Sequence, residues 1–215
     1  MSYICILANK NGAVAAADTR LTKSNKFLPI TYHTDHRQKV FKSTEGHVVW
    51  GLCGISTNGF RNLTGAMNKI LADDGIPFAE RLDSFRAVTP EMTARYQKKF
   101  KKAAAVITLL YASYEDPQAP DVGYITVQNG YIAVDMKCTL PCAIQGGANA
   151  AFLTSLDGFR PKDIYSIRKL ALMSRKRVQE AIDYDAERKK QDRKYVATVG
   201  GRILTKIVDK ELKNR

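Results

Sequence analysis

Cysteines and long apolar runs are both scarce in this sequence. Four cysteines in 215 residues are too few for a disulfide scaffold, so we expect a reducing, cytoplasmic setting. No stretch approaches the roughly 18 consecutive apolar residues that a transmembrane helix needs, and the first residues do not resemble a secretory signal. Glycine and proline are too infrequent for a collagen-like or low-complexity chain. We therefore expect one globular domain over residues 1–215 and no membrane association.

Acidic residues are also few: 21 aspartates and glutamates stand against 34 lysines and arginines, for a net charge of +13. The excess is concentrated in residues 160–215, which hold 17 basic and 8 acidic residues. An excess of this kind suits nucleic acid or another acidic partner. However, aromatic residues are not interleaved with the cations, which favours a solvated helix face. Both interpretations stay open.

Metal-binding patterns are missing from the sequence. His33 and His36 lie on a polar segment without a third ligand nearby, and Cys138 and Cys142 lack zinc-site spacing and a second pair. We expect no metal site and no cofactor.

Apolar patterns predict the order strands, two helices, strands, two helices, strands. Hairpins are expected over residues 3–18, 39–53 and 123–136, the last across Asn129-Gly130, with a further strand over 105–111. Helical spacing predicts helices over 56–72, 77–104, 148–156 and 161–186, the second with a cap at Thr89-Pro90-Glu91. Extended segments over 195–199 and 203–208 flank Gly200-Gly201.

The order of elements lacks a strict alternation of strands and helices, so mostly antiparallel sheets are expected, each with one face to cover. We predict an α+β fold, a four-layer α/β/β/α sandwich with two central sheets and helices outside.

Ser2 is the first candidate for chemistry. An initiator methionine before so small a residue is a substrate for methionine aminopeptidase, and its removal would leave Ser2 with a free α-amine. An α-amine has a pKa of about 7.7–8.0, so it can act as general base for its own hydroxyl without a histidine. Such a site also needs a cation, a carboxylate to hold that cation, and backbone N–H donors for the oxyanion.

Residues after Ser2 supply these groups at characteristic spacings. Gly12 and Asp18 lie 10 and 16 positions beyond Ser2, and residues 16–22 read Ala-Ala-Asp-Thr-Arg-Leu-Thr. Lys39 is followed by Val40, and Gly51-Leu52-Cys53-Gly54 ends 15 positions after Lys39. In these features the sequence resembles the proteasome β subunits and the peptidase subunit of the bacterial two-component ATP-dependent protease, which are N-terminal nucleophile hydrolases.

The resemblance implies a fold, a site and partners. The four-layer sandwich would be of the N-terminal nucleophile hydrolase type. Ser2 would be nucleophile and base, Lys39 the cation, Asp18 its carboxylate and Gly54 the oxyanion donor, with Arg20 as a buttress of the loop. The resemblance also implies a homo-oligomeric ring, a peptide or protein substrate and an ATP-dependent unfoldase partner.

Three departures from the family keep a second hypothesis open. Serine stands at position 2 in place of threonine, and Gly146 stands where the family has a supporting serine. Asp185 matches a second family aspartate, but the residues 188–190 are Arg-Lys-Lys where Ser-Gly-Gly is expected. The first hypothesis is a proteasome-like peptidase or amidase. The alternative is a catalytically inactive scaffold or binding subunit that self-assembles, as proteasome α subunits do, with a basic surface for an acidic partner.

Overall fold

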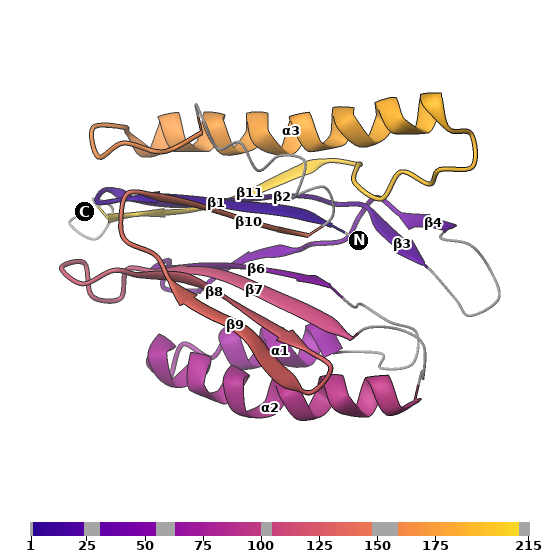
Figure 1. Ribbon diagram of the computed structural model, residues 1–215. Coiled ribbons are helices and arrows are strands. Elements are labelled where there is room, and N and C mark those ends of the chain that lie inside the picture. Colours follow the sequence, from indigo (N-terminus) through magenta and orange to yellow (C-terminus); the bar gives the residue numbers. More distant parts are fainter. Residues whose placement is uncertain (1, 24–30, 55–62, 100–104, 148–158, 211–215) are drawn as a thin grey trace.

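Two antiparallel sheets lie face to face, and helices lie along their outer faces (Figure 1). The computed structural model describes residues 2–23, 31–54, 63–99, 105–147 and 159–210. The first sheet has the strand order β10-β1-β2-β11, and the second has the order β5-β6-β7-β8-β9. Among the described helices, none is long and apolar enough to cross a membrane.

The first sheet contains the expected N-terminal hairpin. Its strands are β10 (Cys142–Gly147), β1 (Tyr3–Asn9), β2 (Gly12–Asp18) and β11 (Ile203–Asp209). Every residue of β1 and β2 is buried, because the second sheet covers one face of the first sheet and helix α3 (Ile167–Gln191) covers the other. In this register Tyr3 lies opposite Gly147 of β10, so the first strand begins where β10 ends.

The second sheet contains the other two expected hairpins. Its strands are β5 (Val40–Lys42), β6 (Val48–Gly54), β7 (Val106–Ser113), β8 (Asp121–Gln128) and β9 (Tyr131–Lys137). The turn between β8 and β9 has positive φ at both Asn129 and Gly130, which is the conformation that favours this residue pair in tight hairpins. A small third sheet, β3 (Leu21–Lys23) with β4 (Thr31–Thr34), was not expected.

The main core lies between the two sheets. It combines Ile4, Ile6 and Ala15 of the first sheet with residues such as Val49 and Leu110 of the second. A second cluster joins the other face of the second sheet to α1 (Leu63–Leu71) and α2 (Phe78–Lys99). Two smaller clusters hold α3 against the first sheet. Burial of apolar side chains at about 25 cal/mol per Å² is the main force behind this stacking.

Three helix boundaries differ from the prediction. The expected cap at Thr89-Pro90-Glu91 is wrong, because Pro90 lies inside the continuous helix α2. Packing of neighbouring residues such as Phe85 on the second sheet outweighs the lost N–H donor there. Helix α3 begins at Ile167 rather than near 161, where the Ser166 side chain caps the helix by accepting the N–H of Lys169 at 3.3 Å, and it continues to Gln191. Residues 56–62 and 148–156 lie outside the described ranges.

The predicted fold class is wrong in its helix content. The described residues form mostly β sheet, in two antiparallel sheets with three helices, where a four-layer α/β/β/α sandwich of the N-terminal nucleophile hydrolase type was expected. Within the described ranges, α3 alone covers the first sheet. Its 25 residues span about 37 Å, which is enough for one helix to cover the buried strands β1 and β2. The function therefore has to be argued from the site and not from the fold class.

Candidate functional site

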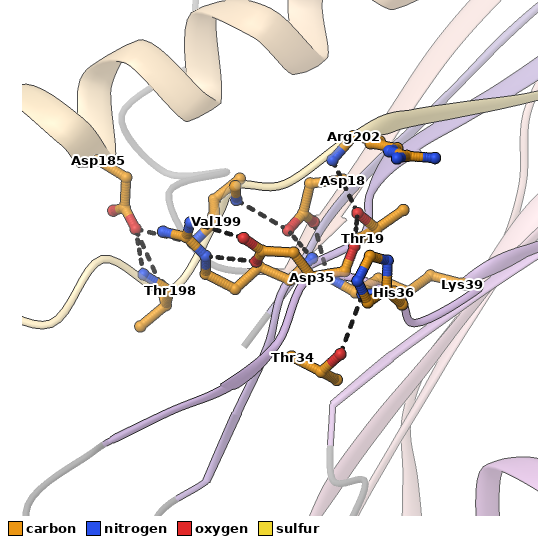
Figure 2. A network of polar contacts seen from close by, with 12 residues as sticks. Asp18, Thr19, Thr34, Asp35, His36, Lys39, Asp185, Thr198, Val199 and Arg202 are labelled. Atoms are coloured by element: carbon orange, nitrogen blue, oxygen red, sulfur yellow. Dashed lines mark hydrogen bonds and ion pairs between the residues drawn. The ribbon is translucent and has the colours of Figure 1, made fainter.

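A buried ion pair between Asp18 and Lys39 forms the centre of the site (Figure 2). Asp18 is the last residue of β2 in the first sheet, and Lys39 directly precedes β5 in the second. Nζ of Lys39 lies 2.8 Å from Oδ1 of Asp18, and the two side chains are 3% and 0% exposed. The pair joins the two sheets at one end. Because both groups are buried, dissolved salt screens the attraction between them poorly.

Three backbone N–H groups also donate to Asp18. The N–H of Tyr3 donates to Oδ1 at 2.8 Å, and those of Arg20 and Gly200 donate to Oδ2 at 3.1 and 3.0 Å. An ionised carboxylate only accepts hydrogen bonds, and here each of its oxygens has two donors. These contacts fix the carboxylate and, through it, the ammonium group of Lys39.

The environment of Lys39 makes its ammonium group unusually acidic. Burial lowers the pKa of Lys39 from its ordinary value of 10.5, while the charge of Asp18 and its hydrogen bond oppose that effect. A nearby cation in turn favours the neutral form of an amine. Lys39 therefore has the charge and the burial to depress the pKa of an α-amine placed beside it.

Ser2 lies at the same end of the two sheets. It is 8% exposed and directly precedes β1. The peptide N–H between Ser2 and Tyr3 donates to the Asp18 oxygen that also accepts Lys39. A Cβ on Gly147 would stand 1.7 Å from the Ser2 carbonyl oxygen, so only glycine allows β10 to pack against it. The structure thus brings Ser2, Asp18 and Lys39 together.

Gly54 ends β6 near this group. The Leu52 N–H donates to the Lys39 carbonyl at 3.1 Å, which places the end of β6 beside Lys39. Gly54 has a φ of +117°, and a Cβ there would meet the Val106 carbonyl oxygen at 2.0 Å. Among the described contacts none joins Gly54 to Ser2, so its role as oxyanion donor stays a prediction.

Gly146 lies where the two sheets pack closely together. A Cβ at this position would stand 2.9 Å from Cδ1 of Leu110 and 3.3 Å from Sγ of Cys53, both in the second sheet. The family's supporting serine at this position would therefore require the side chains of Leu110 and Cys53 to shift.

Asp185 is fully buried and acts on the site indirectly. It accepts hydrogen bonds from the N–H groups of Thr198 and Val199, the latter at 2.8 Å, and from the Tyr195 hydroxyl at 2.6 Å. Residues 195–199 do not form a strand in the structure, because these N–H groups are turned to Asp185. The next N–H along the chain, that of Gly200, donates to Asp18. Asp185 thus holds the segment after α3 in place, and Figure 2 shows it beside Thr198 and Val199.

A second ion pair holds the loop after β2. Arg20 donates to both carboxylate oxygens of Asp35, at 2.8 and 3.2 Å, and this bonding is the main reason that the pKa of Asp35 is lowered. Thr19 donates to the Asp35 carbonyl at 2.6 Å and accepts the N–H of Arg202 at 2.8 Å (Figure 2). These contacts fit a buttress role for Arg20. Asp35 was missed, since no sequence signal marks it as a partner.

Comparison with known proteins leaves the site as the main guide to function. No protein-family model matches the chain, and no curated protein matches its sequence. In the part of the chain that the structure describes, no group of three or more His, Cys, Asp or Glu side chains is placed to hold a metal ion.

Proposed function

We propose that this protein is a hydrolase with an N-terminal nucleophile, a peptidase or amidase that acts through Ser2 once Met1 is removed. One observation carries the proposal: the Lys39 ammonium and the N–H of the Ser2–Tyr3 peptide bind the same oxygen of the buried Asp18. This contact ties the buried ion pair to the start of β1, directly after Ser2. A buried, paired cation whose pKa is shifted by burial marks a candidate catalytic site.

The proposed mechanism uses only groups of this chain. The free α-amine of Ser2 takes the hydroxyl proton, and Oγ attacks the carbonyl carbon of the amide. Lys39 stabilises the developing negative charge, and the Gly54 N–H would hold the oxyanion. The amine of the substrate leaves with the proton, and an ester on Oγ remains. Water then attacks this ester, which releases the acid and regenerates the hydroxyl.

The proposal includes a setting and partners. All four cysteines are free thiols, which supports action in a reducing cytoplasm. The substrate would be a peptide or protein, and the resemblance supports a homo-oligomeric ring served by an ATP-dependent unfoldase. The basic C-terminal region makes nucleic acid or another acidic partner an alternative ligand of the assembly.

The inactive scaffold is the second candidate, because of two observations. Gly146 carries no supporting hydroxyl, and a Cβ there would press on Leu110 and Cys53. Residues 188–190 continue the helix α3 as Arg-Lys-Lys, where the family has Ser-Gly-Gly. The two candidates differ in whether the Ser2 hydroxyl reacts.

The activity should have a bell-shaped pH profile. Turnover of a fluorogenic peptide amide should rise through the pKa of the α-amine, ordinarily about 7.7–8.0, because only the neutral amine accepts the proton. It should fall again before pH 10.5, since burial lowers the pKa of Lys39 and the cation is lost. Measured kcat/KM between pH 6 and about 10.5 tests this.

The free energy of unfolding should rise over the same alkaline range in which the activity falls. When the folded state loses the Lys39 proton, the unfolded state still holds it up to pH 10.5, so the free energy of unfolding rises with pH in that window. The readout is the difference in unfolding free energy between wild type and Lys39→Ala, which removes the other titrating groups from the comparison. If the activity falls at alkaline pH because the protein unfolds, the assignment of that fall to Lys39 is wrong.

A further inference from the structure

Arg177 is a buried arginine on the face of α3 that packs against the first sheet. Its side chain is only 6% exposed, although arginine is seldom buried unless it is paired. Nε donates to the Tyr3 hydroxyl at 3.2 Å, and the two Nη groups lie 3.3 Å from Glu180 Oε2 and 3.4 Å from Gln145 Oε1. The guanidinium also lies over the Phe159 ring, 4.7 Å from its centroid. These contacts explain how the guanidinium charge is tolerated in the interior. They do not explain why an arginine stands at this position.

Tyr3 connects this arginine to the candidate site. The residue is fully buried, and its hydroxyl donates to Gln145 Oε1 at 2.8 Å. Its N–H donates to Asp18 Oδ1 at 2.8 Å. Tyr3 is therefore held at both ends, by the carboxylate of the site at its backbone and by Arg177 and Gln145 at its ring. Burial raises the pKa of the Tyr3 hydroxyl well above its ordinary value, so the group stays a neutral donor at working pH.

Gln145 contacts both Tyr3 and Arg177, so the three side chains form a triangle of contacts. It lies on β10 opposite Cys5 of β1, two residues before Gly147, which packs on the Ser2 carbonyl. The triangle of Tyr3, Gln145 and Arg177 thus joins β1, β10 and α3 directly behind the residue that follows Ser2. A shift of Arg177 would move the Tyr3 ring, and the Ser2–Tyr3 peptide with it.

We propose that Arg177 is a positioning residue for Ser2 and acts through Tyr3. It holds the start of β1 so that the Ser2 hydroxyl keeps its place relative to Lys39. The inference rests on the proposed function in that it takes Ser2 as the nucleophile. Since a misplacement of about 1 Å can cost about a hundredfold in rate, a contact behind the reacting residue is enough to matter.

The variants Arg177→Met and Tyr3→Phe test this role. Methionine keeps much of the packing and removes the donors, and phenylalanine removes one oxygen. Each should lower kcat for a peptide amide about a hundredfold with KM changed less than about threefold, because substrate contacts are untouched. The double variant should be no slower than either single variant, as expected for two residues of one connection. Lys176→Met is the matched control, because Lys176 is the exposed neighbour on the same helix.

A second readout does not depend on activity. Selective ¹⁵N-tyrosine labelling gives ten amide signals, and the signal that is lost in Tyr3→Phe is that of Tyr3, whose hydrogen exchange reports its bond to Asp18. Arg177→Met should speed this exchange about tenfold or more, while Lys176→Met leaves it unchanged. If Arg177→Met fails to fold, the kcat of Tyr3→Phe relative to wild type decides whether the positioning role holds.

The outcomes separate the two proposals. Unchanged kcat and unchanged Tyr3 exchange in a folded Arg177→Met protein would overturn the positioning role, even if its melting temperature fell. An inactive wild type would instead count against the proposed function, and the exchange of Tyr3 would still decide whether Arg177 holds the start of β1.

Discussion

Replacing Lys39 with alanine should reduce turnover at least about a thousandfold and also weaken the fold. The first effect follows from the loss of the only cation at Asp18 among the described contacts, which the mechanism needs for the developing charge. The second follows because Asp18 would stay buried without its counter-charge, and breaking a buried pair costs about 3–5 kcal/mol. Peptide hydrolysis and urea unfolding of the same preparation measure the two effects.

Lys42→Ala provides the matched control for this experiment. Lys42 lies three residues further on, in β5, and is exposed, so its removal should change neither activity nor stability by more than about 0.5 kcal/mol. A Lys39→Ala protein that remains as active as the control would remove the cation from the mechanism. A protein that loses only stability would leave the pair as a structural feature.

Removing the Ser2 hydroxyl should abolish turnover with little effect on the fold. Ser2→Ala deletes the nucleophile and should lower kcat at least about a thousandfold, whereas the unfolding free energy should change by about 1 kcal/mol or less. Ser2→Thr keeps the hydroxyl and should preserve or raise activity, because threonine is the nucleophile of the family that the sequence resembles. Steady-state hydrolysis of one peptide amide compares the three proteins.

Two results would contradict this expectation. Equal activity in wild type and Ser2→Ala would show that hydrolysis comes from another group or a contaminant. An inactive Ser2→Thr protein beside an active wild type would mean that the added methyl group does not fit near Gly147, whose packing on the Ser2 carbonyl is tight.

Local patterns predicted the three hairpins well. The apolar clusters before and after Asn11-Gly12, and the pair Asn129-Gly130, act through neighbouring residues, so hairpins at these places need no knowledge of the rest of the chain. The pairing of Asp18 with Lys39 was also predictable, but only from the family spacing. No pattern within the loop after β2 shows that the chain returns to the end of that strand.

Contacts between distant segments were the part that sequence could not provide. Asp185 was matched to a second family aspartate, but its bonds to residues 198 and 199 depend on the path of the chain after α3. The lack of space at Gly146 comes from Leu110 and Cys53 in the other sheet. The fold class was misjudged for a related reason, since helical spacing alone does not say how much of each sheet one helix covers.

The most direct test of the central claim is the intact mass of the protein purified from its native host, before and after treatment with a peptide epoxyketone. This reagent needs both a hydroxyl and a free α-amine on the same residue. The account predicts a chain that begins at Ser2 and gains one covalent adduct, while the Ser2→Ala protein gains none. Quantitative retention of Met1 with no adduct, together with the same background hydrolysis in wild type and Lys39→Ala, would contradict it and leave the inactive scaffold in its place.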